Sequence, residues 1–425
     1  MALPLERIAE AIKSPKKTIL ISQAVKHQLR LRFHSESYLD TREVNQPVTL
    51  FLDWVNTLIP KDKFAIFTNL FRFPCQTVEF VDRMYGELER IFDGRNAAIN
   101  FQFKDPTLRD DWEWYRQERL REPIVWKEQG WPMMKTAINS VLIVDLPSVQ
   151  TTERPEPYFY WLGIENVIDY YYNGKDIEWI IFKQPNDEIA VFDDQSYRTF
   201  STKDNQIVSI LSENKHDLGF CPARFFWTTP ISLTNPDIKK SPITSQLANL
   251  DWLLFFSISK KHLDLYAPYP IYSAYEADCD FSNNETGDYC DGGFLRSKEG
   301  QYKMYRDGSV EKCPVCSDKR IAGVGSFIEV PVPTGDNPDL GKNPIQITTI
   351  DKDSLDYNVS EQERLKTEIY NSVIGIGGEV QQKTSINETQ VKANYEDKTS
   401  VLHNLKGNFE AAQKFVDDTI CKLRY

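Results

Sequence analysis

Four of the seven cysteines lie close together in the chain, at Cys279, Cys290, Cys313 and Cys316. Ten residues separate the first two, and 22 residues separate Cys290 from the Cys313-Pro-Val-Cys316 turn. Thiolates are soft ligands, and four of them suit a tetrahedral zinc ion at ~2.3 Å from each sulfur. Because four cysteines close the coordination sphere, the pattern predicts a structural zinc site and not a catalytic one. Reduced thiols, or a redox pair formed by Cys313 and Cys316, are the alternatives.

Other patterns that resemble functional motifs lack a required residue. Residues 278–288 alternate oxygen-bearing side chains as a calcium loop does, but Asn283 stands where that loop needs glycine, so we expect a solvated loop. Residues 375–378 are glycine-rich but lack the Gly-Lys-Ser/Thr of a phosphate loop, which favours a helix stop or hinge. The five histidines are scattered outside known catalytic motifs. The sequence therefore predicts a protein that is not an enzyme.

The composition indicates a folded protein with an acidic balance. Of 425 residues, 41% are hydrophobic, and 50 Lys and Arg against 62 Asp and Glu give a net charge of −12. A protein that neutralises phosphates should be basic, so this charge disfavours tight wrapping of DNA but allows a passage through which DNA slides. The sequence contains no apolar run of the ~20 residues that a membrane span needs. Because we find no secretory signal, we expect synthesis in the cytoplasm.

The first half of the chain divides into a helical and a β-rich part. Residues 1–135 are predicted to be mainly helical, with a mixed stretch at 46–59 and a helix within 75–92. Residues 136–240 contain short β-branched and aromatic runs separated by turn residues, which predicts an antiparallel meander. The expected strands lie at 140–144, 158–161, 167–172, 179–183, 189–192 and 207–211.

The second half contains three predicted helices and one insertion. Helical spacing of leucines predicts a helix over 241–267, with Ser241 as its cap and Pro242 in its first turn. A loop-rich segment, 268–355, carries the cysteine cluster. A second helix, 356–374, contains a capping box at Ser360–Glu363 and ends at the glycine-rich segment 375–386. A single apolar stripe predicts one long helix over 387–425.

This order of elements resembles the portal proteins of tailed bacteriophages. The residues that support the resemblance are Leu218-Gly219-Phe220-Cys221-Pro222-Ala223-Arg224, Ser245-Gln246-Leu247 and Gly407-Asn408-Phe409-Glu410. The resemblance covers about the last half of the chain. It implies an α+β, portal-like fold with a β-rich wing (136–240), a helical part of the wing (1–135), a two-helix stem (241–267 and 356–374), a loop-rich clip with the zinc site (268–355), a tunnel loop (375–386) and a long C-terminal wing helix (387–425).

The resemblance also implies a function and partners. Portals are rings, twelve-fold in the assembled phage, at the capsid vertex through which double-stranded DNA is packaged and ejected. The chain would then reside in the virion, made in the host cytoplasm, and contact the major capsid protein, the terminase and a head–tail adaptor. The tunnel-loop residues expected to line the channel are Gly375, Gly377, Gly378, Glu379, Gln381, Gln382 and Lys383. Neighbouring subunits are expected to bury the apolar sides of the stem helices.

A different class of function is the alternative. The cysteine cluster also fits a zinc-binding intracellular interaction protein, or a nucleic-acid-processing protein, in which the cluster binds a partner. A monomer or dimer in solution would favour this interpretation, whereas a large ring would favour the portal. A hydrolytic enzyme is a third interpretation, which would require turnover of a nucleic acid or a peptide.

Overall fold

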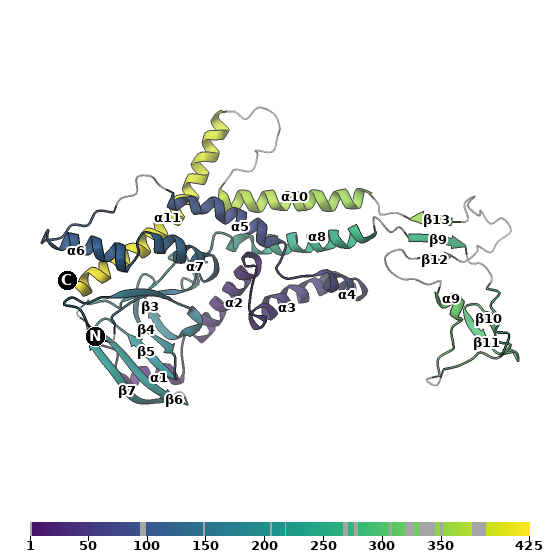
Figure 1. The fold of residues 1–425 in the computed structure, drawn as a ribbon, viewed down its shortest axis with the longest axis horizontal. Coiled ribbons are helices and arrows are strands. Elements are labelled where there is room, and N and C mark those ends of the chain that lie inside the picture. Colours follow the sequence, from purple (N-terminus) through teal and green to yellow (C-terminus); the bar gives the residue numbers. More distant parts are fainter. Residues whose placement is uncertain are drawn as a thin grey trace. The chain divides into compact units, whose positions relative to one another are not determined.

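The computed structural model in Figure 1 describes twelve ranges of the chain: residues 2–93, 99–147, 149–204, 206–216, 218–266, 271–275, 279–305, 308–318, 327–330, 345–348, 352–375 and 388–425. Its contacts divide into two units. The first unit comprises Met1–Leu58, Arg72–Leu254 and Leu365–Tyr425, and the second comprises Ile59–Phe71 and Phe255–Arg364. Both units contain helices and strands, as the α+β class predicts.

The N-terminal third is helical. Its helices are α1 (Leu5–Lys13), α2 (Thr18–Ser35), α3 (Thr41–Leu58), α4 (Lys61–Leu70), α5 (Thr77–Leu88), α6 (Leu108–Trp114) and α7 (Trp131–Thr136), with a 3₁₀ turn η1 (Glu89–Phe92) and two π-helical turns, η2 (Tyr115–Arg119) and η3 (Trp126–Gly130). The predicted mixed stretch at 46–59 is wrong, because α3 continues past Pro47. Phe51 and Val55 lie four residues apart on this helix and are both buried, so packing outweighs the backbone hydrogen bond that proline cannot make.

A five-stranded antiparallel meander forms the centre of the first unit. Its strands are β3 (Val167–Tyr172), β4 (Ile177–Gln184), β5 (Glu188–Phe192), β6 (Ser196–Lys203) and β7 (Gln206–Lys215), in the order β3-β4-β5-β6-β7. The predicted meander is therefore confirmed, and β3 has the predicted bounds. The turns place Gly174, Asn186, Asp187 and Asp204 in the left-handed backbone region that glycine, asparagine and aspartate tolerate best.

Both faces of the sheet are buried at β4 and β5, whereas the edge strand β7 is largely exposed. Alternate residues of each strand face opposite sides. Ile180 and Phe182 of β4 join a cluster that includes Ile21 of α2 and Ile143 of β1, whereas Ile181 packs with Ile8 of α1. A second sheet has the order β2-β1-β8 and consists of β1 (Val141–Asp145), β2 (Tyr158–Leu162) and β8 (Ala223–Phe225). The short 3₁₀ turns η4 (Ile164–Asn166) and η5 (Thr244–Gln246) complete this part of the chain.

Two long helices, α8 (Leu247–Tyr266) and α10 (Lys352–Ile374), run antiparallel. In the first unit, Gln246 Nε2 donates to Ser372 Oγ at 2.7 Å and Asn249 Nδ2 donates to Glu368 Oε1 at 3.2 Å. In the second unit, Ser257 Oγ donates to Gln362 Oε1 at 3.3 Å. The first helix begins later than predicted, after the η5 turn, and the second begins earlier than predicted.

The apolar side chains of α8 and α10 were predicted to need neighbouring subunits for burial. Part of each helix is buried within the single chain, where Leu250 and Ile369 are fully buried and Leu254 and Val373 are at most 2% exposed. Other apolar side chains of the pair are exposed, with Leu265 at 39% and Tyr357 at 65%. The expectation therefore stays a prediction for the exposed side chains only.

The last helix, α11 (Glu388–Arg424), packs on the β-rich part of the first unit. Phe409 lies within 5.5 Å of the Trp227 ring centroid, and Arg224 donates to the backbone oxygen of Ala411 at 2.7 Å. Asn408 bonds the loop that follows β8. Its Oδ1 accepts from the Thr228 N–H at 3.0 Å, and its Nδ2 donates to Thr229 Oγ1 at 3.1 Å.

Replacing Asn408 with alanine is expected to lower the free energy of unfolding by ~0.5–1.5 kcal/mol, because the partly buried hydrogen bonds from the Thr228 N–H and hydroxyl to the buried Asn408 side chain are lost. Asn404→Ala, at an exposed position one helical turn earlier, is the matched control, since only the backbone oxygen of Asn404 is used. Denaturant unfolding of the full chain would measure the free energy of unfolding of both variants and of the parent chain. Equal stability of the two variants would contradict the role of Asn408.

Candidate metal centre

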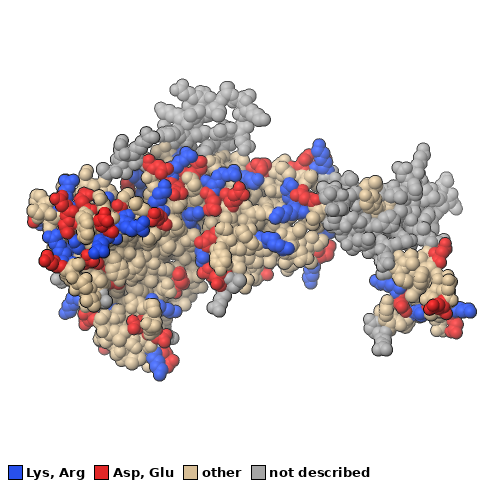
Figure 2. Space-filling view, viewed as in Figure 1, with Lys and Arg blue, Asp and Glu red and all other residues tan. Residues whose placement is uncertain are grey.

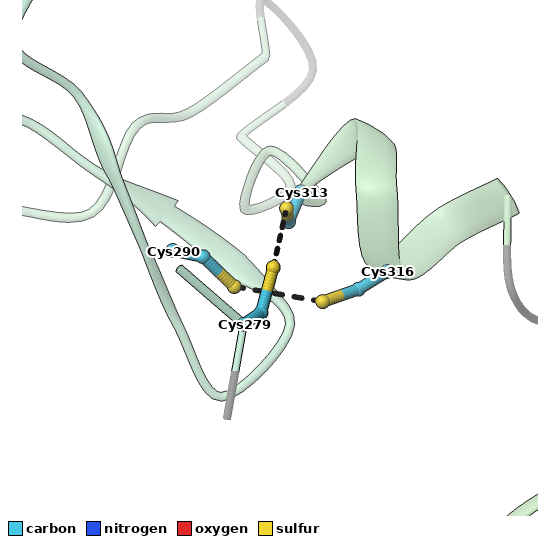
Figure 3. A group of neighbouring side chains, drawn as sticks. All are labelled: Cys279, Cys290, Cys313 and Cys316. Carbon is cyan, nitrogen blue, oxygen red and sulfur yellow. Dashed lines mark hydrogen bonds between the residues drawn. The ribbon is translucent and has the colours of Figure 1, made fainter. Parts of the chain in front are cut away.

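The structure brings the four predicted cysteines together in the second unit. The sulfur atoms of Cys279, Cys290, Cys313 and Cys316 all lie within 4.8 Å of one another (Figure 3). Cys290 belongs to the strand β10 (Tyr289–Asp291), which pairs with β11 (Phe294–Arg296), and Cys316 lies in the short helix α9 (Pro314–Asp318). Cys313 directly precedes α9, so the Cys-x-x-Cys turn directs both of its sulfurs at one point.

A tight hairpin turn holds Cys290 against the Cys-x-x-Cys turn. Gly292 and Gly293 join β10 to β11 with φ values of 57° and 89°, the conformation that a two-residue hairpin turn requires and that glycine adopts most easily. The Gly293 N–H donates to the Cys290 sulfur, and the Gly293 carbonyl accepts from the Cys313 N–H at 2.9 Å. The Cys290 N–H in turn donates to the Phe281 carbonyl at 3.0 Å, which fixes the segment that follows Cys279.

The sulfur positions fit a tetrahedral ion. Four sulfurs at ~2.3 Å from one metal lie ~3.8 Å from each other. The Cys279–Cys313 pair is separated by 3.9 Å and the Cys290–Cys316 pair by 3.6 Å. A disulfide would bring two sulfurs to ~2.05 Å, and all four cysteines are free thiols. The four residues can therefore hold a metal ion.

The local electrostatics favour one thiolate among the four sulfurs. Burial opposes ionisation of Cys313, but the N–H groups of Cys316 and Val315 donate to its sulfur, so the pKa of Cys313 lies below its ordinary value. Burial raises the pKa of Cys290, and burial together with the neighbouring sulfurs raises the pKa of Cys316 well above its ordinary range. Several thiolates at this spacing therefore need a cation to compensate their charge.

The expectation of a solvated loop over 278–288 holds for most of its described residues, which are exposed or partly exposed, and Asp288 is the buried exception. Asp288 is only 4% exposed, and its carboxylate accepts from Lys303 Nζ and from Thr286 Oγ1. These two contacts lower the pKa of Asp288. Asp278 lies outside the described residues, and the Asn283 carboxamide oxygen caps the turn by accepting from the Glu285 N–H at 2.9 Å.

Most of the predicted tunnel loop lies outside the described residues. Gly375 is described, and it ends α10 with a φ of 78°, the left-handed conformation of a helix C-cap. This agrees with the predicted helix stop. The other six candidate residues are Gly377, Gly378, Glu379, Gln381, Gln382 and Lys383, and none of them is described.

Sequence reasoning missed a cluster of buried charged side chains in the first unit. Glu122 and Asp417 are 4% and 3% exposed, and their carboxyl groups interact with each other. Glu122 also accepts from Trp126 Nε1 and Gln413 Nε2, both at 2.8 Å, and its carboxylate lies 3.3 Å from Arg116 Nε. Burial and the adjacent carboxylate raise the pKa of Asp417 to about 9, so Asp417 keeps its proton at neutral pH.

This acid pair gave no signal in the sequence. Acidic residues such as those at 417 and 418 are common on helix surfaces, and only the fold brings position 122 to α11.

Acidic and basic side chains alternate over much of the face shown in Figure 2, where no large basic patch gathers on the described residues. Within the described ranges, none of the helices has the length and the apolar character that a transmembrane segment requires. Comparison with protein-family models gives no match, and comparison with curated proteins gives none either.

Proposed function

We propose that this chain is the subunit of a phage portal, a ring that conducts double-stranded DNA and performs no chemistry of its own. The observation that carries the proposal is the antiparallel pair α8 and α10. The pair flanks an insertion of small sheets and the cysteine cluster, and α11 then returns to the β-rich part of the first unit. Stem, clip and wing follow one another in this order in the portal family that the sequence resembles.

Two further features support this function. Gly375 ends α10 in a left-handed conformation, and the following glycine-rich segment precedes α11, as a tunnel loop would. The net charge of −12 per chain would make a ring strongly negative, and a negative wall keeps a polyanion from adhering. In this proposal the tunnel-loop residues line the narrowest part of the channel.

The proposed location is the portal vertex of the virion, after synthesis in the host cytoplasm. The proposed partners are further copies of the chain in a ring of about twelve, the DNA in the channel, the major capsid protein, the terminase and a head–tail adaptor. A heterologous contact between different faces of neighbouring subunits is the kind of interface that closes a ring.

We also propose that the four cysteines bind zinc in a structural role. The sulfur spacing fits zinc, and the set of four thiolates is one that zinc prefers and that leaves no position open for a substrate. The ion would join the three chain segments that carry Cys279, Cys290 and the Cys-x-x-Cys turn, which have little apolar core of their own.

The second unit also contains a mixed three-stranded sheet in the order β12-β9-β13. It consists of β9 (Ile271–Tyr275), β12 (Phe327–Val330) and β13 (Ile345–Thr348).

The particle mass of the purified full-length chain tests the portal proposal. We expect light scattering to give roughly twelve times the 49.4 kDa chain mass, and negative-stain images to show rings with a central hole. Dilution series would separate a stable ring from concentration-dependent clustering. A monomer at every concentration would contradict the proposal.

One observation favours the alternative, a zinc-bearing interaction protein. The segment around the cysteines exposes several aromatic side chains, among them Tyr302 and Phe294. A monomer that binds one zinc ion and one partner protein would support this alternative against the portal.

A further inference from the structure

The hairpin that carries Cys290 has two chemically different faces. Residues directly opposite each other in an antiparallel pair point to the same face, and neighbours along a strand point to opposite faces. Cys290 is paired with Leu295, so the sulfur and the buried leucine share the back face. Tyr289 is paired with Arg296, and Asp291 is paired with Phe294, so these four side chains lie on the front face.

A third extended segment widens the front face. Tyr302 is bridged to Arg296, and their side chains bond, with Arg296 Nη2 donating to Tyr302 Oη at 2.8 Å. Met304 lies two residues further along and therefore on the same side, while the intervening Lys303 reaches Asp288 on the back. We define the hairpin face as Tyr289, Phe294, Tyr302 and Met304.

The hairpin face is exposed and held in a fixed arrangement. Its four side chains are between 40% and 66% exposed. The rings of Phe294 and Tyr302 meet edge to face with centroids 6.4 Å apart, and the Arg296 guanidinium lies 4.2 Å from the Tyr302 ring centre. Asp291 Oδ2 lies 2.6 Å from Arg296 Nε in an ion pair, so the two charges on this face are already paired. A rigid group of aromatic and methionine side chains with paired charges is typical of a protein-binding surface.

The charge of the module indicates which partner fits. Residues 276–320 carry ten acidic and seven basic side chains, a net charge of −3. A divalent ion bound by four thiolates would add two further negative charges behind the hairpin face. Nucleic acid would be repelled by this charge, whereas a basic protein segment would be attracted to it.

We propose that the hairpin face binds a basic segment of a different protein, with apolar side chains of that segment packed on the four residues and its lysines or arginines attracted by the net negative charge of residues 276–320. The inference rests on the metal site of the proposed function, because the bound ion fixes the back of the hairpin. It does not require the chain to form a ring. In a portal, this face would belong to the clip.

Fluorescence anisotropy with labelled probes tests this proposal on the full-length, metal-loaded chain. The main probe is a peptide of about 12 residues that alternates lysine and leucine. Three comparison probes are used. In one peptide glutamate replaces each lysine, and in a second peptide serine replaces each leucine. The third probe is a thymine oligonucleotide of about 20 nucleotides. We expect the lysine–leucine peptide to bind at least ~10-fold more tightly than each comparison probe, and its affinity to fall as salt rises.

Variants locate the binding surface. Tyr289→Ser combined with Met304→Ser leaves the Asp291–Arg296–Tyr302 bonds in place and is expected to weaken binding ~10-fold or more. Tyr171→Ser, at a tyrosine of β3 that is 47% exposed, is the matched control and should bind like the parent chain. Zinc content and particle mass are measured on the same samples, so that loss of the metal or the ring is seen separately from loss of binding.

Three results would overturn the proposal. The first is equal binding of the basic and acidic peptides, and the second is equal affinity of the double variant and the Tyr171→Ser control at full zinc content. The third is tighter binding of the oligonucleotide, which would instead assign the face to single-stranded nucleic acid.

Discussion

Replacing Cys313 or Cys316 with serine is expected to abolish zinc binding by the purified chain and to unfold residues 279–318, while the first unit stays folded. Among the described residues of this segment, the buried apolar side chains are those of Leu295 and Cys313, which is too small a core for independent stability. Structural zinc contributes an apparent ~10–16 kcal/mol to the folding of comparable small domains at neutral pH. Loss of one thiolate removes most of that contribution.

Zinc analysis and hydrogen exchange would measure this effect. The parent chain should carry about one zinc ion per chain after purification, and a chelator should remove it together with the exchange protection of β10 and β11. Cys421→Ser is the matched control, because Cys421 lies in α11, in the first unit. A parent chain without zinc, or serine variants that retain it, would contradict the metal site but would leave the portal proposal untouched.

The cysteine site could be predicted from sequence because its evidence is local in the chain. Thiol chemistry and a Cys-x-x-Cys turn define a small set of structures, and a loop-rich segment with little apolar character needs a metal to fold. The turn at Gly292 and Gly293, which positions Cys290, could have been found from the two adjacent glycines between short β-prone runs. The bond from Lys303 to Asp288 could not have been predicted from the sequence, because it depends on how the segment around residues 302–304 lies beside the hairpin.

The β-rich part of the first unit was predictable where the strands are apolar and where glycine, asparagine or aspartate residues mark the turns between them. β3 lies between turn residues and consists of β-branched, aromatic and acidic residues, so its bounds follow from the pattern. β6 was missed because its sequence, SYRTFSTK, is polar, and only the fold shows that Arg198 is buried against Asp193. The mixed stretch predicted at 46–59 belongs to α3, which continues through Pro47 because tertiary packing stabilises it.

Helix ends were harder to predict than helix existence. The second helix was predicted to begin at 356 with a capping box at Ser360–Glu363, yet α10 begins at Lys352. The capping box therefore lies inside the helix, where Asn358 and Gln362 bond each other one turn apart. A capping motif does not fix a helix start, because the same residue types are also tolerated inside a helix. For α8 and α10, amphipathic spacing showed which side chains are buried but not what covers them.

The buried pair formed by Glu122 and Asp417 predicts a pH dependence of stability. Asp417 has a pKa of about 9 in the folded chain and an ordinary value of 3.8. Between these two values the unfolded state binds fewer protons than the folded state, so the free energy of unfolding falls as pH rises. The slope attributable to this residue is at most ~1.4 kcal/mol per pH unit.

Asp417→Asn is expected to remove this dependence. The asparagine side chain is neutral at every pH, as the protonated carboxyl is, and Glu122 keeps its contacts with Arg116, Trp126 and Gln413. The Asp417→Asn variant should therefore match the stability of the parent chain near pH 5 within ~1 kcal/mol and become progressively more stable than the parent toward pH 8, by up to ~3–4 kcal/mol.

The Asp418→Asn variant, changed at the exposed neighbouring position, is the control and should follow the parent curve of stability against pH. Denaturant unfolding of the first unit, followed by tryptophan fluorescence from pH 5 to 8.5, measures all three curves. Parallel curves for Asp417→Asn and the parent would show that Asp417 is ionised in the folded chain, which would contradict its raised pKa.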